Sequence, residues 1–99
     1  MKYKTYLYEP ITGRDEKKFV NDCLNSNWIS SKGKYIEKFE KRFSNFIKIK
    51  YSITVSNGTA ALHLALLALN IKKKDEVIVP TFTYISPVNA IKYVGAKVK

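Results

Sequence analysis

The sequence carries its clearest structural signal in residues 55–66, which read Val55-Ser56-Asn57-Gly58-Thr59-Ala60-Ala61-Leu62-His63-Leu64-Ala65-Leu66. Residues 51–55, which are mostly β-branched or aromatic, predict a short strand. Residues 56–59 are good turn formers, and residues 60–69 are apolar nearly all round. A helix of that composition is expected to be buried on most of its sides. The segment therefore predicts a strand, a turn and a buried helix.

Two further strands and one helix are predicted downstream. Residues 76–80 form a strand that is apolar on both faces, as a buried parallel strand usually is. Ser86 and Pro87 open a helix, with the serine as its cap and the proline in its first turn, and Gly95 follows its end. Residues 96–99 begin a third strand.

Two amphipathic helices are predicted upstream. The first starts near Thr12, which can cap it, and Asp15 and Glu16 suit the positive end of the helix dipole. Its apolar stripe consists of Phe19, Val20, Cys23 and Leu24. Residues 28–33 read as a loop. The second helix spans about residues 34–46 and carries apolar residues at spacings of three and four, namely Ile36, Phe39, Phe43 and Phe46.

This order of elements predicts an α/β fold with a mostly parallel sheet, in which crossover helices connect the strands. Such a sheet needs cover on both of its faces. The 99 residues offer few strands and too few helices to provide that cover. We therefore expect the sequence to be a fragment of a larger domain.

The composition is typical of a soluble, cytoplasmic protein. Hydrophobic residues make up 45% and charged residues 26%, which favours a globular chain over a disordered one. Cys23 is the sole cysteine, which excludes an internal disulfide and fits a reducing compartment. No apolar run approaches the roughly 20 residues that cross a bilayer. Residues 1–10 also lack the apolar core of a secretion signal.

The formal net charge of +10 allows two interpretations. One is a small basic nucleic-acid-binding protein that neutralises phosphates. The other is a lysine-rich surface without a binding role, and the pattern favours it: the cations are spread along the chain, and only Arg14 and Arg42 are arginine. Base recognition typically relies on arginine, so a nucleic-acid partner is the weaker interpretation.

The turn at residues 56–59 is the first candidate binding site. A helix that starts after such a turn directs unpaired backbone N–H groups outward, where the helix dipole adds positive charge, and phosphates bind there. Gly58 would let a ligand approach the backbone, Thr59 would add a hydroxyl donor, and Ala60 would keep the space clear. An ordinary capped turn is the alternative. The segment matches neither a Walker loop nor a dinucleotide-binding motif.

A second candidate lies where the next strand ends, in residues 80–84. Ligands of open parallel sheets gather outside the carboxyl ends of the strands, and both candidates lie at that edge. An aromatic side chain beside a phosphate-binding turn can stack on a flat heterocycle. The alternative is that Phe82 and Tyr84 merely pack.

These segments together resemble the sugar-nucleotide aminotransferase family, whose members depend on pyridoxal 5'-phosphate and have the aspartate-aminotransferase fold. The likeness rests on residues 55–66, on residues 75–84 with Asn89-Ala90, and on residues 8–10 and 27–40. It is closest to the perosamine synthase-like 4-aminotransferases and covers nearly the whole sequence. It implies the start of a three-layer α/β/α large domain, with residues 1–50 as an N-terminal helical segment and residues 51–99 as the start of the cofactor-binding domain.

The resemblance also implies roles for individual residues. Gly58, Thr59 and Ala60 would hold the cofactor phosphate, and Tyr84 would stack on the pyridine ring. Three residues of the loop would lie near the sugar nucleotide, namely Trp28, Ser30 and Gly33. For Trp28 the alternative of a core residue that closes the first helix stays open.

The activity implied by the resemblance is the transfer of an amino group, from glutamate, to a nucleotide-linked keto-deoxy-sugar in polysaccharide or glycan biosynthesis. The family's catalytic lysine and the carboxylate that pairs with the pyridine nitrogen lie downstream of residue 99, so no catalytic residue and no metal ligand is assigned here. The chain alone is expected to be inactive, and the complete protein is expected to be a homodimer. His63 is interpreted as a hydrogen-bonded packing residue and Cys23 as a core residue. Besides nucleic-acid binding, a non-catalytic interaction remnant is the remaining alternative.

Overall fold

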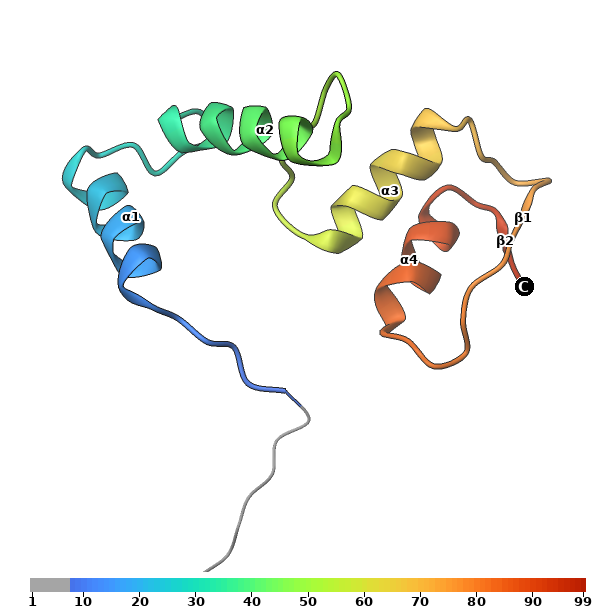
Figure 1. The fold of residues 1–99 in the computed structure, drawn as a ribbon. Helices are drawn as coiled ribbons and strands as arrows, with labels where there is room; N and C mark the ends of the chain where they lie inside the picture. The colour runs from blue at the N-terminus through green and yellow to red at the C-terminus, as the bar shows by residue number, and fades with distance from the viewer. Residues whose placement is uncertain (1–7) are drawn as a thin grey trace, which may run out of the picture. The chain divides into compact units, whose positions relative to one another are not determined.

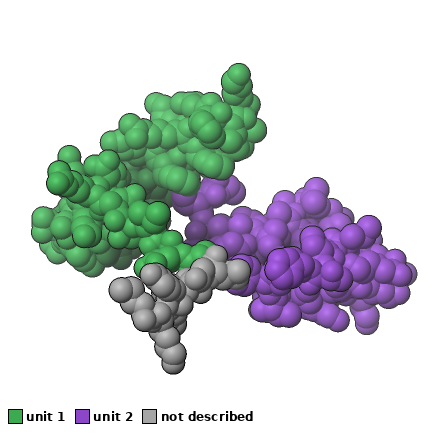
Figure 2. Space-filling model, turned by 60° about the horizontal axis from the view of Figure 1, so that its bottom comes forward, with its two compact units in different colours: residues 1–52 green, residues 53–99 purple. Residues whose placement is uncertain are grey.

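A computed structural model of the chain describes residues 8–99 and divides the protein into two compact units after Ser52 (Figure 2). Among these described residues, unit 1 contains two helices, and unit 2 contains two helices and a small sheet. No helix within residues 8–99 is both long and apolar enough to cross a bilayer. The candidate sites fall into both units, so each unit is described by itself.

The first helix in the described part of unit 1 is α1, Arg14–Asn25 (Figure 1). Its N-cap is Gly13, whose N–H donates to Oε2 of Glu16 at 2.7 Å. The prediction that Thr12 caps this helix is therefore wrong, because the Glu16 carboxylate reaches back to the Gly13 amide and satisfies it. The negative charge at the start of α1 is as expected. The helix ends at Asn25.

Helix α2, Lys34–Ile47, follows the loop and confirms the second amphipathic helix. Phe39 and Phe43 stack on one face of it, with their ring centroids 5.7 Å apart. The helix ends at Ile47, and its C-cap, Lys48, adopts a left-handed conformation with a φ of 58°. The segment after α2 contacts this helix through Ser52, whose hydroxyl donates a hydrogen bond to the carbonyl of Glu40 at 2.6 Å.

Unit 2 contains helix α3, Gly58–Ala68, strand β1, Glu76–Val77, helix α4, Ile85–Tyr93, and strand β2, Lys97–Val98. The two strands are parallel, with Val77 opposite Val98, and α4 connects them. The hydrogen-bond ladder extends past β1, where the amide of Val79 donates to the carbonyl of Lys99 at 3.0 Å. The predicted parallel pairing through a crossover helix is confirmed.

Residues 51–55 do not form the strand that their β propensity predicts. A strand is stabilised by a ladder of hydrogen bonds to a neighbour, and within residues 8–99 the sheet consists of β1 and β2 alone. The β propensity of residues 51–55 is therefore not enough, because no neighbouring strand pairs with them within residues 8–99. The same lack of neighbours affects the predicted buried strand, since Ile78 is 87% exposed.

Helix α3 is far less buried than its composition predicts. Leu62 and Leu64 each keep 42% of their surface open to solvent, and Leu67 keeps 53%. One side of the helix packs on α4, where the rings of His63 and Tyr93 meet edge to face at 5.4 Å. The described residues thus cover one side of an all-round apolar helix and leave the others uncovered.

The small core of unit 2 lies on α4 and the turn after it. Ala90, Ile91 and Ala96 are buried, with exposures of 0%, 3% and 4%. The N-cap of α4 is Tyr84 rather than the predicted Ser86, because the helix begins at Ile85, two residues earlier than a Ser86 cap implies. Pro87 still falls in the first turn, where the missing N–H costs nothing.

Candidate functional site

The start of α3 leaves backbone donors open. Asn57 is the N-cap, and its side-chain oxygen Oδ1 accepts a hydrogen bond from the amide of Ala60 at 2.9 Å. In the region that the structure describes, the amides of Gly58 and Thr59 have no recorded acceptor. Asn57 is the residue that the sequence reasoning missed, although asparagine directly before an apolar helix is a strong N-cap signal.

The space beside these amides is open as well. A Cβ placed on Gly58 would meet no atom within 4 Å, and Gly58 is itself exposed. An anion can therefore reach the two amides and the Thr59 hydroxyl, at the positive end of an apolar helix. The Ala60 amide is already bound to Asn57, so this residue contributes its small side chain rather than a donor.

The segment after β1 forms a second part of the site. A pocket of about 400 Å³ lies at the carboxyl ends of the strands and includes Pro80, Tyr84 and Lys99 in its lining. Tyr84 is 67% exposed, and Phe82, at 97% exposed, does not pack as the alternative interpretation proposed. Helices α3 and α4 run side by side in the same sense, so their N-termini lie at the same end (Figure 1).

A separate candidate site is the loop between α1 and α2, in unit 1. Trp28, Ser30 and Gly33 line one pocket of about 250 Å³ together with Lys32 and Lys34. Trp28 is 59% exposed, so the alternative that it is a core residue is wrong for the described part of the chain. The loop is locally ordered, because the Ser30 hydroxyl donates to the carbonyl of Lys32 and accepts from its amide, both at 3.2 Å.

A charged cluster joins the two ends of this loop. Oδ2 of Asp22, near the end of α1, accepts a hydrogen bond from the hydroxyl of Tyr35 at 2.8 Å and forms an ion pair with Nζ of Lys34. The contact with Lys34 first, and then the contact with Tyr35, lowers the pKa of Asp22 below its ordinary value. The hydrogen bond with Asp22 also raises the pKa of Lys34 and of Tyr35.

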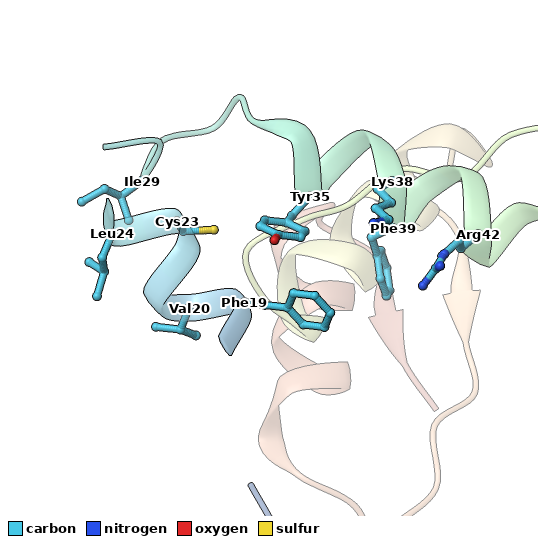
Figure 3. A pocket seen from close by; sticks show the side chains of 9 residues that line it. All are labelled: Phe19, Val20, Cys23, Leu24, Ile29, Tyr35, Lys38, Phe39 and Arg42. Atoms are coloured by element: carbon cyan, nitrogen blue, oxygen red, sulfur yellow. The ribbon is translucent and has the colours of Figure 1, made fainter. Parts of the chain in front are cut away.

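A separate apolar pocket of about 460 Å³ lies between α1 and α2 (Figure 3). Its lining combines the predicted stripe of α1 with residues of α2, and Figure 3 shows the Cys23 sulfur directed toward Tyr35. Cys23 is half-buried rather than fully in a core. None of the candidate binding residues lines this pocket.

His63 is a packing residue, as expected, since its ring contacts Tyr93. Its imidazole has no recorded hydrogen bond among residues 8–99, so the expected polar partner is not found there. The structure thus brings Gly58, Thr59 and Ala60 to the same end of the helix pair as Tyr84, within unit 2. It gathers the three loop candidates in a pocket of their own, within unit 1.

Comparison with known proteins gives a consistent result. The profile of the DegT/DnrJ/EryC1/StrS aminotransferase family matches residues 10–99. The chain is 62% identical over 96 residues to a GDP-perosamine synthase of Escherichia coli O157:H7, covering 97% of this chain and 26% of that protein. It is 57% identical over 90 residues to a GDP-perosamine synthase of Vibrio cholerae, covering 91% of this chain and 24% of that protein.

The structure is similar to that of a sugar aminotransferase, Spr1654 of Streptococcus pneumoniae, which has been solved in PLP, PMP and apo forms. The TM-score is 0.84 at 33% identity, over 98% of this chain and 24% of that one. The predicted fold, part of the aspartate-aminotransferase architecture, is confirmed. The chain spans about a quarter of the length of the relatives that it matches.

Proposed function

The chain belongs to the DegT/DnrJ/EryC1/StrS aminotransferase family, and on this premise we propose that the whole protein transfers an amino group from glutamate to a keto-deoxy-sugar linked to a nucleotide. The names of the GDP-perosamine synthases favour GDP as that nucleotide and a 4-amino sugar as the product. Polysaccharide or glycan biosynthesis is the corresponding biological role.

The proposed cofactor is pyridoxal 5'-phosphate, which supplies an electron sink for the amino transfer when it is bound. Gly58, Thr59 and Ala60 form its phosphate site. Two backbone amides and one hydroxyl serve as donors, and the open space beside Gly58 leaves room for the phosphate. Tyr84, at the start of the neighbouring helix, offers a largely exposed ring that stacks on the pyridine.

The proposed substrate site is the loop pocket of unit 1. Trp28 offers an exposed aromatic face to a base or sugar. Gly33 leaves the space beside Trp28 free of a side chain, since a Cβ at this position would lie 3.9 Å from the Cβ of Trp28. Lys32 and Lys34, in the same pocket, supply positive charge for a diphosphate. Ser30 shapes the loop through its hydrogen bonds with Lys32.

The organisation of the whole protein is proposed from the same family membership. Residues 1–50 are an N-terminal helical segment, and residues 51–99 are the start of the cofactor-binding α/β domain. The catalytic lysine is contributed by sequence beyond this stretch. The whole protein acts as a homodimer in the cytoplasm, and the single cysteine within residues 1–99 fits a reducing compartment.

The single observation that carries this proposal is the pair of open amides at Gly58 and Thr59, in a chain that the family profile matches from residue 10 to residue 99. The test is an amination assay of the gene product at its natural length. With pyridoxal phosphate, glutamate and a GDP-linked keto-sugar, we expect 2-oxoglutarate and an amino sugar to accumulate together. A purified, cofactor-loaded protein that forms neither product, with any nucleotide-linked keto-sugar, would refute the proposal.

A further inference from the structure

The loop that carries Trp28, Ser30 and Gly33 is closed at its base by the Asp22 contacts with Lys34 and Tyr35. We propose that Asp22 is a positioning residue for the nucleotide-sugar pocket, which holds two walls of that pocket in place without touching the ligand. The identity of the ligand rests on the proposed function, whereas the positioning role rests on the geometry of unit 1.

The contacts of Asp22 with Lys34 and Tyr35 join the two ends of the loop. Asp22 lies in the last turn of α1, and Lys34 and Tyr35 are the first two residues of α2. All of the loop therefore lies between the two ends of one contact, and a single carboxylate oxygen, Oδ2, receives both donors. Closing a loop at its base removes conformational freedom from every residue within it.

The two partners of Asp22 line the pocket, while Asp22 itself does not. Lys34 and Tyr35 belong to the same lining as Trp28, Ser30 and Gly33. The Tyr35 ring is also held from its other side, because it meets the Phe19 ring at a centroid distance of 5.3 Å. The hydroxyl and the ring of Tyr35 are thus fixed by two residues of α1.

Asp22 also affects the positive charge of the pocket. Asp22 partly neutralises Lys34 and directs its ammonium group, which leaves Lys32 as the other cation of the pocket. Other titratable groups near this cluster are Lys18 and Cys23 on α1 and Glu37 on α2, and Lys38 and Arg42 on α2 line the apolar pocket together with Tyr35. Substitution of Asp22 leaves all of these groups unchanged, so its effect can be measured separately.

The first experiment uses the gene product at its natural length and follows the fluorescence of Trp28, which is the sole tryptophan of residues 1–99; any tryptophan outside these residues is replaced by phenylalanine, so that the emission reports Trp28. In the unmodified chain, we expect a step in Trp28 emission as the pH falls through the depressed pKa of Asp22. Asp22→Asn should lack this step and show the acid-type emission already at neutral pH. Asp15→Asn, an exposed aspartate of the same helix, is the matched control and should behave as the unmodified chain does. An unchanged step in Asp22→Asn overturns the proposal.

The second experiment measures kinetics on the gene product at its natural length. Asp22→Asn and Tyr35→Phe, which keeps the ring but loses the hydroxyl, should each raise the KM for the nucleotide sugar about two- to fivefold, a range typical of exposed polar contacts. They should leave kcat and the KM for glutamate unchanged, as Asp15→Asn should throughout. A loss of kcat with an unchanged KM overturns the positioning role.

The two experiments separate this proposal from the proposed function. If the protein aminates no nucleotide-linked sugar but Asp22→Asn abolishes the emission step, the proposed function is wrong and the positioning role stands. If the protein is active but the variants change neither the emission step nor the KM, the positioning role is wrong. Circular dichroism of each variant, with helix content equal to that of the unmodified protein, shows that the helices are retained and that the variant is folded.

Discussion

Replacing Thr59 with alanine should weaken cofactor binding without weakening the fold. In the described part of the chain, the Thr59 hydroxyl has no recorded partner, so its removal breaks no contact that stabilises α3. With the cofactor bound, the hydroxyl would donate to a phosphate oxygen. A hydrogen bond to a charged group contributes about 1.5–3 kcal/mol, which corresponds to a loss of affinity of about 10- to 150-fold.

The assay is the binding of pyridoxamine 5'-phosphate to the gene product at its natural length. This form of the cofactor binds without a covalent bond to the protein, so its Kd reports the phosphate and ring contacts directly. Isothermal titration gives the Kd, and urea unfolding followed by circular dichroism gives the free energy of unfolding. Thr12→Ala, a threonine of unit 1 that is exposed and outside the candidate site, is the control.

Two outcomes would refute the reasoning. If Thr59→Ala binds the cofactor as tightly as the unmodified protein does, the hydroxyl is no phosphate donor. If it instead lowers the free energy of unfolding of the cofactor-free protein by about 1 kcal/mol, a typical capping contribution, then Thr59 rather than Asn57 stabilises the helix start.

Three further predictions address the elements around the site. Asn57→Ala should lower the free energy of unfolding of the cofactor-free protein by about 1 kcal/mol, measured by urea unfolding, because the Ala60 amide loses its acceptor. Glu16→Gln should reduce the loss of α1 stability in acid: hydrogen bonds from its own amide and from Gly13 lower the Glu16 pKa, so its contribution is present above the ordinary value of 4.5 and is lost as the pH falls through the depressed one. A thermal melt of the variant that shows the same acid dependence as the unmodified chain would contradict this. Ala90→Leu should cost about 1–3 kcal/mol in thermal unfolding, because Ala90 has an exposure of 0% and no room for a larger side chain; Lys92→Leu, exposed on the same helix, should cost little.

The sequence predicted the helices well, because each of them is specified by residues close to one another. The apolar stripes of α1 and α2 and the turn before α3 are local signals, and the structure follows them. The errors at helix starts are small and have local causes. Glu16 caps the Gly13 amide in place of Thr12, and α4 begins ahead of Ser86.

The errors in burial have a different origin. The strand predicted at residues 51–55 and the buried α3 both depend on neighbours that come from elsewhere in a chain. The relatives are about four times as long as this sequence. The β propensity of residues 51–55 and the all-round apolar surface of α3 therefore indicate contacts that residues 8–99 do not supply. Side-chain contacts such as that of Asp22 with Tyr35 join residues that are 13 positions apart, and no local pattern predicts them.

The capping of α3 explains how a phosphate site can exist without destabilising the helix that builds it. A helix start leaves several amides without partners, and leaving all of them open favours fraying. Asn57 satisfies the Ala60 amide, and its carbonyl accepts the amide of Ala61 at 3.1 Å. The open amides then belong to Gly58, which is exposed, and to Thr59, so water can occupy them until an anion does. Because the side chain of Asn57 binds the third amide, the cap and the phosphate have separate donors, and binding need not undo the contact that holds the helix start in place.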